Sequence, residues 1–90
     1  MTILVVSDIH ANLAALDAVL AAAGQVDAVW NLGDTVGYGP SPGECVDRMI
    51  AVSPELTLLG NHDAAAIGLL SLDEFNPIAR AATLWTAGQL

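Results

Sequence analysis

The chain alternates short apolar runs with segments in which apolar residues recur every three or four positions. Residues 2–7, TILVVS, are mostly β-branched and apolar until Asp8, and residues 26–31, VDAVWN, and 55–59, ELTLL, form two further short runs. Runs of this length are typical of strands covered on both faces, as in parallel sheets. We therefore predict three strands, each ending close to a group of polar residues.

Helical spacing fills the intervals between these runs. In residues 13–23, LAALDAVLAAA, the leucines and the valine recur at helical spacing, with Asn12 placed to cap the first turn and Gly24 to end the helix. A second helix is predicted from residue 42 to about residue 52. Three residues mark its start, namely Ser41 as N-cap, Pro42 as first helical residue and Glu44 as the acid of a capping box.

The last third of the chain is predicted to be helical. Asp63 is expected to cap a short helix that runs through about Leu70, and Asn76 to cap a last helix that begins at Pro77. The element order strand, helix, strand, helix, strand, helix, helix is typical of an α/β fold with a parallel sheet. We expect residues 1–90 to belong to one domain.

Polar residues with metal-binding side chains follow each predicted strand. Because the carboxyl ends of parallel strands meet at one edge of a sheet, these side chains are expected to lie close together. The six residues are Asp8 and His10 after the first strand, Asp34 after the second, and Asn61, His62 and Asp63 after the third.

Four of these residues suit a divalent metal ion. Asp8 and His10 are two positions apart, so if strand geometry persists they point to the same side and offer a carboxylate oxygen and an imidazole nitrogen to one ion. Asp34 could reach the same ion from the next strand, and Asn61 offers an amide oxygen. A carboxylate shared between ions would make a two-metal centre.

Each residue also has a purely structural interpretation. Asp8 and Asp34 suit turns, His10 suits a hydrogen-bonded loop, Asn61 suits a left-handed turn, and Asp63 suits a helix N-cap. These explanations are independent of one another, so none of them accounts for the fact that every residue comes directly after a predicted strand. One shared metal site explains the coincidence better, so it is the preferred interpretation.

The net charge limits the classes of molecule that the chain is expected to bind. Ten acidic residues oppose two arginines and no lysine, for a net charge of -8. Nucleic-acid polymers and anionic membranes both require Lys or Arg to replace counterions, so neither is expected to bind. A phosphate could be held only through a metal ion or backbone N–H groups. No apolar run reaches roughly 18 residues and the start lacks a basic signal-peptide head, so we expect a cytoplasmic protein.

The apolar content exceeds what so short a chain can bury. Apolar residues make up 54% of the 90 residues, against roughly 45–50% in soluble domains. A chain of this length removes only roughly 60–65% of its unfolded surface from water. We therefore expect either a homo-oligomer or a larger fold whose carboxy-terminal half is missing here. The single Cys45 cannot form an internal disulfide and is expected to pack in a helix.

Three sequence blocks resemble those of the calcineurin-like metallophosphoesterases. SDIHAN carries Asp-x-His, NLGDTVGYGP carries Gly-Asp, and LLGNHDA carries Gly-Asn-His-Asp, in the order and spacing of that family. The stretches GYGP and FNPIARAATLWT are similar to its bacterial and archaeal phosphodiesterase branch. The resemblance implies the amino-terminal half of a two-sheet αββα sandwich.

The resemblance also implies a role for each candidate residue. The metal ligands would be Asp8 and His10 for the first ion, Asp34 as the bridge, and Asn61 for the second ion. His62 would lie beside the substrate phosphate, and Asp63 would orient His62. A metal-held hydroxide would attack phosphorus in line, and the two ions would neutralise the charge that develops on the phosphoryl oxygens.

Two differences from the family refine this expectation. The serine/threonine phosphatase branch has an arginine where this chain has Tyr38 and a glutamate where it has Asp63, which argues against a protein phosphatase. The later histidine blocks of the family are absent, because no histidine follows His62. Each of two ions requires about five or six donor atoms, and four ligands cannot supply them. We therefore expect an incomplete amino-terminal part of the domain, inactive in isolation.

The leading interpretation is a phosphodiesterase-like, metal-dependent phosphoesterase that acts on a phosphoester at a di-metal centre. Manganese is the preferred ion, and iron, zinc or nickel also suit mixed Asp, His and Asn ligands. Two alternatives stay open. One is a non-catalytic interaction module on the same fold, and the other is a small metal binder that uses only the first site.

Overall fold

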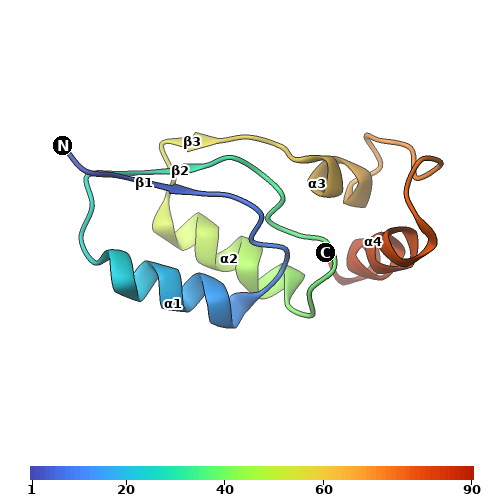
Figure 1. Ribbon diagram of the computed structural model, residues 1–90, viewed down its shortest axis with the longest axis horizontal. Coiled ribbons are helices and arrows are strands. Elements are labelled where there is room, and N and C mark those ends of the chain that lie inside the picture. The colour runs from blue at the N-terminus through green and yellow to red at the C-terminus, as the bar shows by residue number, and fades with distance from the viewer.

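The sheet consists of three parallel strands in the order β1-β2-β3. The computed structural model describes residues 1–90, and Figure 1 shows the arrangement of its elements. The elements are β1 (Ile3–Val6), α1 (Leu13–Ala23), β2 (Ala28–Asn31), α2 (Pro42–Val52), β3 (Leu56–Thr57), α3 (Asn61–Ala66) and α4 (Pro77–Gln89). The predicted α/β fold with a parallel sheet is confirmed.

Side-chain capping bonds mark the starts of two of the four helices. The side chain of Asn12 accepts a hydrogen bond from the Ala15 N–H at 3.0 Å at the start of α1. The side chain of Asn76 does the same for the Ala79 N–H at 2.8 Å at the start of α4. Ser41 is the N-cap of α2 but makes no capping hydrogen bond through its side chain, so the predicted capping box there is wrong.

The segment from β3 to α3 differs from the sequence prediction. Pairing with β2 is confined to Leu56–Thr57, within the predicted strand 55–59. Helix α3 begins at Asn61 and ends at Ala66, short of Leu70, and its N-cap is Gly60. Asp63, predicted as the N-cap, is instead inside the first turn. From there its carboxylate reaches back to accept the Gly60 N–H at 3.1 Å.

The hydrophobic core lies between one face of the sheet and the helices α1 and α2, which both cover that face (Figure 1). Val6 of β1 and Val29 of β2 pack there against Leu16 of α1 and against Cys45 and Met49 of α2. Cys45 is fully buried and unpaired, which confirms its expected place in helix packing.

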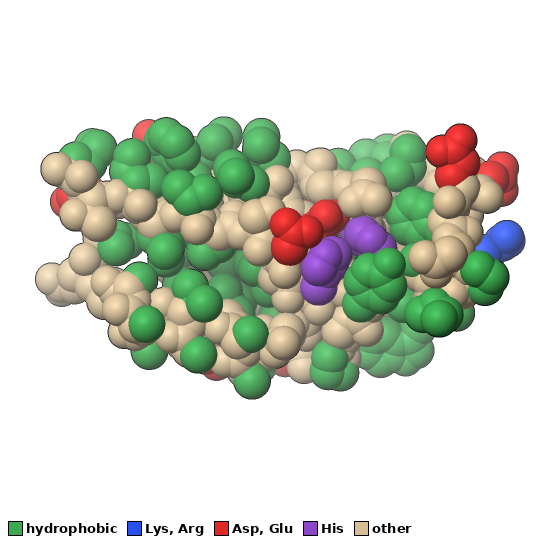
Figure 2. All heavy atoms as spheres, in the orientation of Figure 1, with side chains coloured by type: hydrophobic (Ala, Val, Ile, Leu, Met, Phe, Trp, Pro, Cys, Tyr) green, Lys and Arg blue, Asp and Glu red, His purple; other side chains and the backbone are tan.

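The opposite face of the sheet is apolar and uncovered. Val5, Trp30 and Leu56 form a row in register across the three strands, and Val5 is 50% exposed and Leu56 39% exposed. No helix lies over this face in Figure 1, and hydrophobic side chains gather along the same upper edge in Figure 2. The apolar excess of the composition is therefore concentrated in part on this open face.

Helices α3 and α4 pack together beyond the carboxyl ends of the strands, which gives a molecule of 42 × 21 × 18 Å (Figure 1). The loops that follow the three strands lie at the junction between the sheet and this helical pair. None of the helices has the length and apolarity needed to cross a bilayer.

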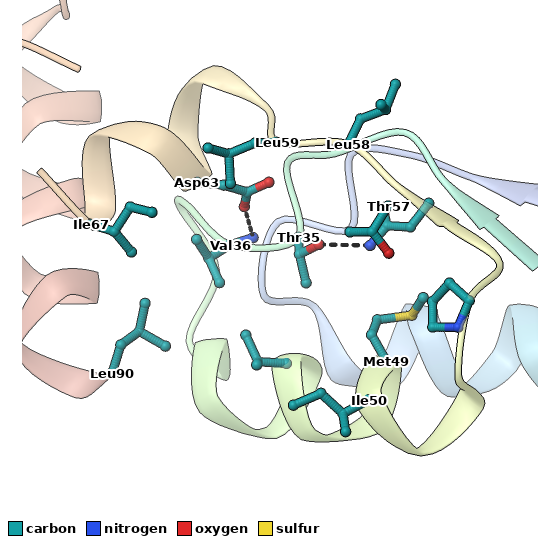
Figure 3. Close-up of a pocket in the computed structure, with 13 residues that line it drawn as sticks. Thr35, Val36, Met49, Ile50, Thr57, Leu58, Leu59, Asp63, Ile67 and Leu90 are labelled. Atoms are coloured by element: carbon teal, nitrogen blue, oxygen red, sulfur yellow. Dashed lines mark hydrogen bonds between the residues drawn. The ribbon is translucent and has the colours of Figure 1, made fainter. Parts of the chain in front are cut away.

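An apolar cavity of about 280 Å³ lies between α2, the segment after β3 and the end of α4 (Figure 3). Three of the polar side chains on its wall, those of Asn31, Thr35 and Asp63, already have partners. Asn31 donates to the Thr35 hydroxyl at 2.9 Å, and the Val36 N–H donates to Asp63 at 3.0 Å. These bonds support the loop after β2, and most of the remaining wall is apolar.

Candidate metal centre

The loops after β1 and β2 run side by side because three backbone hydrogen bonds connect them. The N–H groups of Asp8, His10 and Ala11 donate to the carbonyls of Gly33, Asp34 and Thr35 at 3.0, 2.9 and 2.8 Å. This pairing continues the β1–β2 contact beyond the sheet. It brings the first two candidate ligands next to the third.

The backbone of these loops is left-handed at each candidate ligand. The φ angles are +56° at Asp8, +49° at His10 and +56° at Asp34. Strand geometry therefore does not persist beyond Val6, and the reason given from sequence for the convergence of Asp8 and His10 is wrong. A left-handed conformation costs an L-residue about 1–2 kcal/mol, and such strain is concentrated at functional sites.

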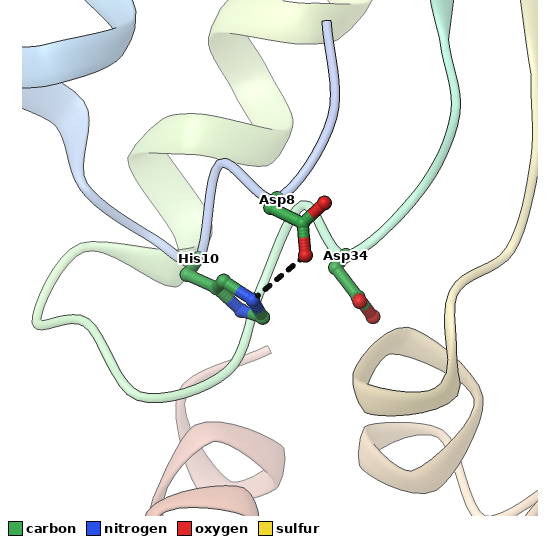
Figure 4. A group of neighbouring side chains, drawn as sticks. All are labelled: Asp8, His10 and Asp34. Carbon is green, nitrogen blue, oxygen red and sulfur yellow. Dashed lines mark ion pairs between the residues drawn. The ribbon is translucent and has the colours of Figure 1, made fainter.

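The donor atoms of Asp8, His10 and Asp34 converge all the same. One ligand atom from each residue lies within 4.8 Å of the others, and Figure 4 shows the three side chains extending from the two loops toward a common space. Metal–ligand bonds of roughly 2.0–2.2 Å place neighbouring donors roughly 3–4.5 Å apart. Small side-chain movements would therefore seat one ion.

His10 turns its Nε2 toward this space. Its Nδ1 lies 3.2 Å from the Val36 carbonyl oxygen, which can accept a hydrogen bond from Nδ1–H and so orient the ring. Nε2 is 3.3 Å from Oδ1 of Asp8, a distance that a shared proton or a metal ion can bridge. Imidazole nitrogen and carboxylate oxygen are common ligands of divalent metals, so the donor set fits such an ion.

Asp8 is ionised more readily than an ordinary aspartate. The Ser7 hydroxyl donates to Asp8 Oδ2 at 2.6 Å, and this bond is the main reason that the pKa of Asp8 lies below its usual value. The neighbouring His10 lowers the pKa of Asp8 further. The carboxylate is exposed, so an ion can reach it from solvent.

Asp34 connects the loop after β2 with the start of α3. Its Oδ1 accepts the His62 backbone N–H at 3.0 Å. The two segments approach so closely that a Cβ on Gly33 would lie 2.7 Å from the Gly60 nitrogen. Asn61 is exposed at the first position of α3, next in the chain to His62. The structure thus brings the Gly-Asn-His-Asp segment against Asp34.

His62 is buried among aromatic rings. Its ring centroid lies 5.0 Å from that of His10, 4.7 Å from that of Tyr38 and 5.3 Å from that of Phe75. The buried Nδ1 has no hydrogen-bond partner. A Cβ on Gly37 would lie 2.7 Å from this atom, so only glycine fits there. Ring packing therefore fixes the position of His62.

The resemblance implies that Asp63 orients His62, and the structure shows which groups the Asp63 carboxylate binds. One carboxylate oxygen accepts the Val36 N–H at 3.0 Å and the other accepts the Gly60 N–H at 3.1 Å. Neither hydrogen bond involves the His62 imidazole. The two bonds join the start of α3, which carries His62, to the loop that carries Asp34.

Two residues of the site were not identified from sequence. Asn31 is almost fully buried and accepts the Gly33 N–H at 3.0 Å, which shapes the turn before Asp34. Its sequence signal is a polar residue at the end of an apolar strand. Tyr38 packs with its ring 5.4 Å from the His10 ring as well as against His62. Its sequence signal is an aromatic residue between two glycines.

The site carries no basic side chain of its own. Figure 2 shows both histidines beside acidic side chains near the middle of this face, while a basic side chain appears only at its far end. Arg48 is paired with Asp17, on α2 and α1. A phosphate at this site would therefore obtain positive charge from bound metal.

Known proteins are similar to this chain in sequence and in fold. The profile of the calcineurin-like phosphoesterase family matches residues 1–88. An uncharacterized protein of Methanocaldococcus jannaschii is 46% identical over 86 residues, which are 93% of this chain and 35% of that protein. The crystal structure of a metallophosphoesterase from Sphaerobacter thermophilus superposes with a TM-score of 0.83 at 60% identity, over 100% of this chain and 37% of that one. The chain thus spans about a third of the length of these relatives. With the three sequence blocks and the converging donors on the same fold, this chain belongs to the calcineurin-like phosphoesterase family.

Proposed function

We propose that the chain forms the first part of the di-metal centre of a phosphodiesterase-like enzyme that hydrolyses a phosphoester. The observation that supports it most is the convergence of Asp8, His10 and Asp34 within 4.8 Å. The close approach of His10 Nε2 to Asp8 Oδ1, at 3.3 Å, supports it as well, because it places a nitrogen and an oxygen ligand side by side. Acidic clusters are common on protein surfaces, but here an imidazole and two carboxylates from two separate loops meet at one point.

Each ligand has a distinct part in this proposal. Asp8 and His10 hold the first ion, Asp34 is shared between two ions, and Asn61 offers its amide oxygen to the second. Asp34 suits the shared position because its Oδ1 is fixed by the His62 N–H on the side of Asn61. When bound, divalent ions supply Lewis-acid charge to the phosphoryl oxygens and activate water. Manganese is the first candidate, with iron, zinc or nickel as alternatives.

His62 is proposed to contact the substrate phosphate. Its ring is held by the neighbouring rings before any substrate arrives, so a hydrogen bond from the imidazole to a phosphoryl oxygen requires little reorganisation. Asp63 contributes indirectly, because it fixes the start of α3 to the loop after β2.

The remaining donors are proposed to come from sequence that the relatives have in addition. The chain offers only two histidines and corresponds to 35–37% of the two relatives. The same additional sequence, or a second copy of the chain, would cover the open apolar face of the sheet. A metal binder without catalysis is the competing proposal, since these 90 residues give a convincing donor set for one ion.

Manganese binding tests the proposal directly. Equilibrium dialysis is performed on the parent chain, on Asp8→Asn, and on Asp47→Asn, a matched control on an exposed face of α2. We expect a manganese site that Asp8→Asn weakens at least about ten-fold, or 1.4 kcal/mol, and that Asp47→Asn leaves intact. Absence of binding, or equal losses in the two variants, would contradict the site.

Turnover separates the enzyme from the metal binder. Hydrolysis of bis(4-nitrophenyl) phosphate is measured with manganese for the 90-residue chain and for a polypeptide extended to the length of the relatives. We expect little turnover from the chain and metal-dependent turnover from the extended polypeptide. Manganese binding without turnover in the extended polypeptide would favour the non-catalytic alternative.

A further inference from the structure

A cleft of about 160 Å³ lies directly beside the metal centre. It is lined by the rings of Tyr38 and Phe75, by Asn61 and His62 at the start of α3, and by Glu74 before α4. Two of these residues, Asn61 and His62, belong to the proposed site. Whatever fills the cleft therefore lies next to a phosphate held by that site.

The position of Tyr38 is not explained by burial. Its side chain is 51% exposed, and its backbone is in the left-handed region at φ +64°. The glycines on both sides allow this arrangement, since a Cβ at Gly37 would meet His62 and one at Gly39 would meet the His10 carbonyl. The loop is thus packed against both histidines and holds an aromatic ring at the edge of the cleft.

The charge of the cleft restricts what can enter it. Glu74 is the only charged residue among those that line it, and no Lys or Arg does so. A second phosphate of the substrate would meet a carboxylate without a cation. Aromatic walls and side-chain amides instead suit an uncharged planar group, which stacks on a ring and exchanges hydrogen bonds at its edge.

We infer that this cleft binds the organic group of the phosphoester, and that this group is planar and uncharged, with Tyr38 as its stacking wall. The inference rests on the proposed function, because the phosphate must be anchored by the metal centre. It assigns Tyr38 a contact with substrate through the face of its ring rather than through its hydroxyl.

Fluorine NMR can observe this contact without turnover. Tyr38 is the only tyrosine of the chain, so labelling with 3-fluorotyrosine gives one resonance from the cleft. The labelled chain, loaded with diamagnetic zinc, is titrated with phenyl phosphate and with methyl phosphate, which have the same charge. We expect phenyl phosphate to shift the resonance saturably and to bind at least ten-fold more tightly than methyl phosphate.

Three variants, followed by calorimetry with the same two ligands, separate stacking from a structural effect. Tyr38→Leu should abolish the preference for phenyl phosphate while methyl phosphate binds as before. Tyr38→Phe keeps the ring and should keep the preference. Trp85→Leu removes a ring that is 47% exposed and lies outside the cleft, and it should also keep the preference.

The outcomes distinguish this inference from the function on which it rests. Equal binding of the two phosphates by the parent chain, or a preference that survives Tyr38→Leu, would overturn the cleft assignment and leave the metal centre in place. Binding of neither phosphate to the zinc-loaded chain would overturn the cleft assignment, whereas the proposed function fails separately, when the extended polypeptide shows no metal-dependent turnover.

Discussion

Replacing Gly60 by alanine should damage the metal centre without altering any ligand. Gly60 has φ -75° and ψ 170°, which alanine adopts without strain. The added methyl group would nevertheless collide with the Asp34 carboxylate and the Asp34 backbone nitrogen, with the Asp34 Cγ at 2.6 Å. The loop cannot easily move aside, because the Asp34 carbonyl accepts the His10 N–H at 2.9 Å.

The expected loss of stability follows from the clash of the added methyl group with the backbone. Adding a methyl group where rigid neighbours must shift costs about 1–3 kcal/mol, and each kcal/mol lowers Tm by about 4–8 °C in a domain of this size. The Asp34 carboxylate is pushed from its bond with the His62 N–H at 3.0 Å, so a metal ion loses a positioned donor. We expect manganese affinity to fall about ten-fold or more.

Gly43→Ala provides the matched control. Gly43 lies in the first turn of α2, and a Cβ there would have no neighbour within 4 Å. Alanine is expected to leave stability unchanged or to raise it by about 0.4–1 kcal/mol. Urea unfolding and manganese titration are measured for the parent and the two variants. If Gly60→Ala matched Gly43→Ala in both measurements, the close approach of α3 to Asp34 would be refuted.

Four further predictions concern single features of the structure. Asp34→Asn should weaken manganese binding more than Asp8→Asn in direct titrations, because a bridging carboxylate serves two ions; equal losses would argue against the bridge. His62→Gln, in a polypeptide that turns over an aryl phosphodiester, should lose about 100–1,000-fold in kcat with metal content nearly intact, and loss of an ion would make His62 a ligand instead. The Cys45 thiol should react with Ellman's reagent about 100-fold more slowly in the native chain than in urea. Burial, with the neighbouring Glu44 and Asp17, raises the pKa of the thiol and reduces its thiolate fraction. Similar rates in the two conditions would show that Cys45 is not buried in the packing of α2. The 90-residue chain should self-associate in sedimentation equilibrium through its open sheet face, and Val5→Lys, in the exposed row of that face, should shift it toward monomer; a parent chain that is monomeric at high concentration would contradict this.

The sequence predicted the parts of the fold that depend on local signals. Asn12 and Gly24 delimit α1, and Asn76 with Pro77 starts α4, because a cap and its helix lie within a few residues of each other. The start of α3 was mispredicted since Asp63 looks like an N-cap locally. Its second partner, the Val36 N–H, lies 27 residues away and is visible only in the fold.

The sequence predicted which residues form the candidate site better than it predicted the geometry of that site. Strand order alone places Asp8, His10 and Asp34 at one edge of a parallel sheet, and their donors do converge. The left-handed turns that aim these side chains were not foreseen, because nothing local in Asp-Ile-His marks them. Tyr38 was missed as a site residue because its contacts are with one histidine in the loop after β1 and one in α3, both distant in sequence.

The position of bound metal is the most direct test of the account. Crystals of the chain grown with manganese would be measured at a wavelength where manganese scatters anomalously. We expect an anomalous difference peak within bonding distance of Asp8, His10 and Asp34. An empty cluster accompanied by manganese at other acidic residues, such as Asp73 and Glu74 before α4, would contradict it.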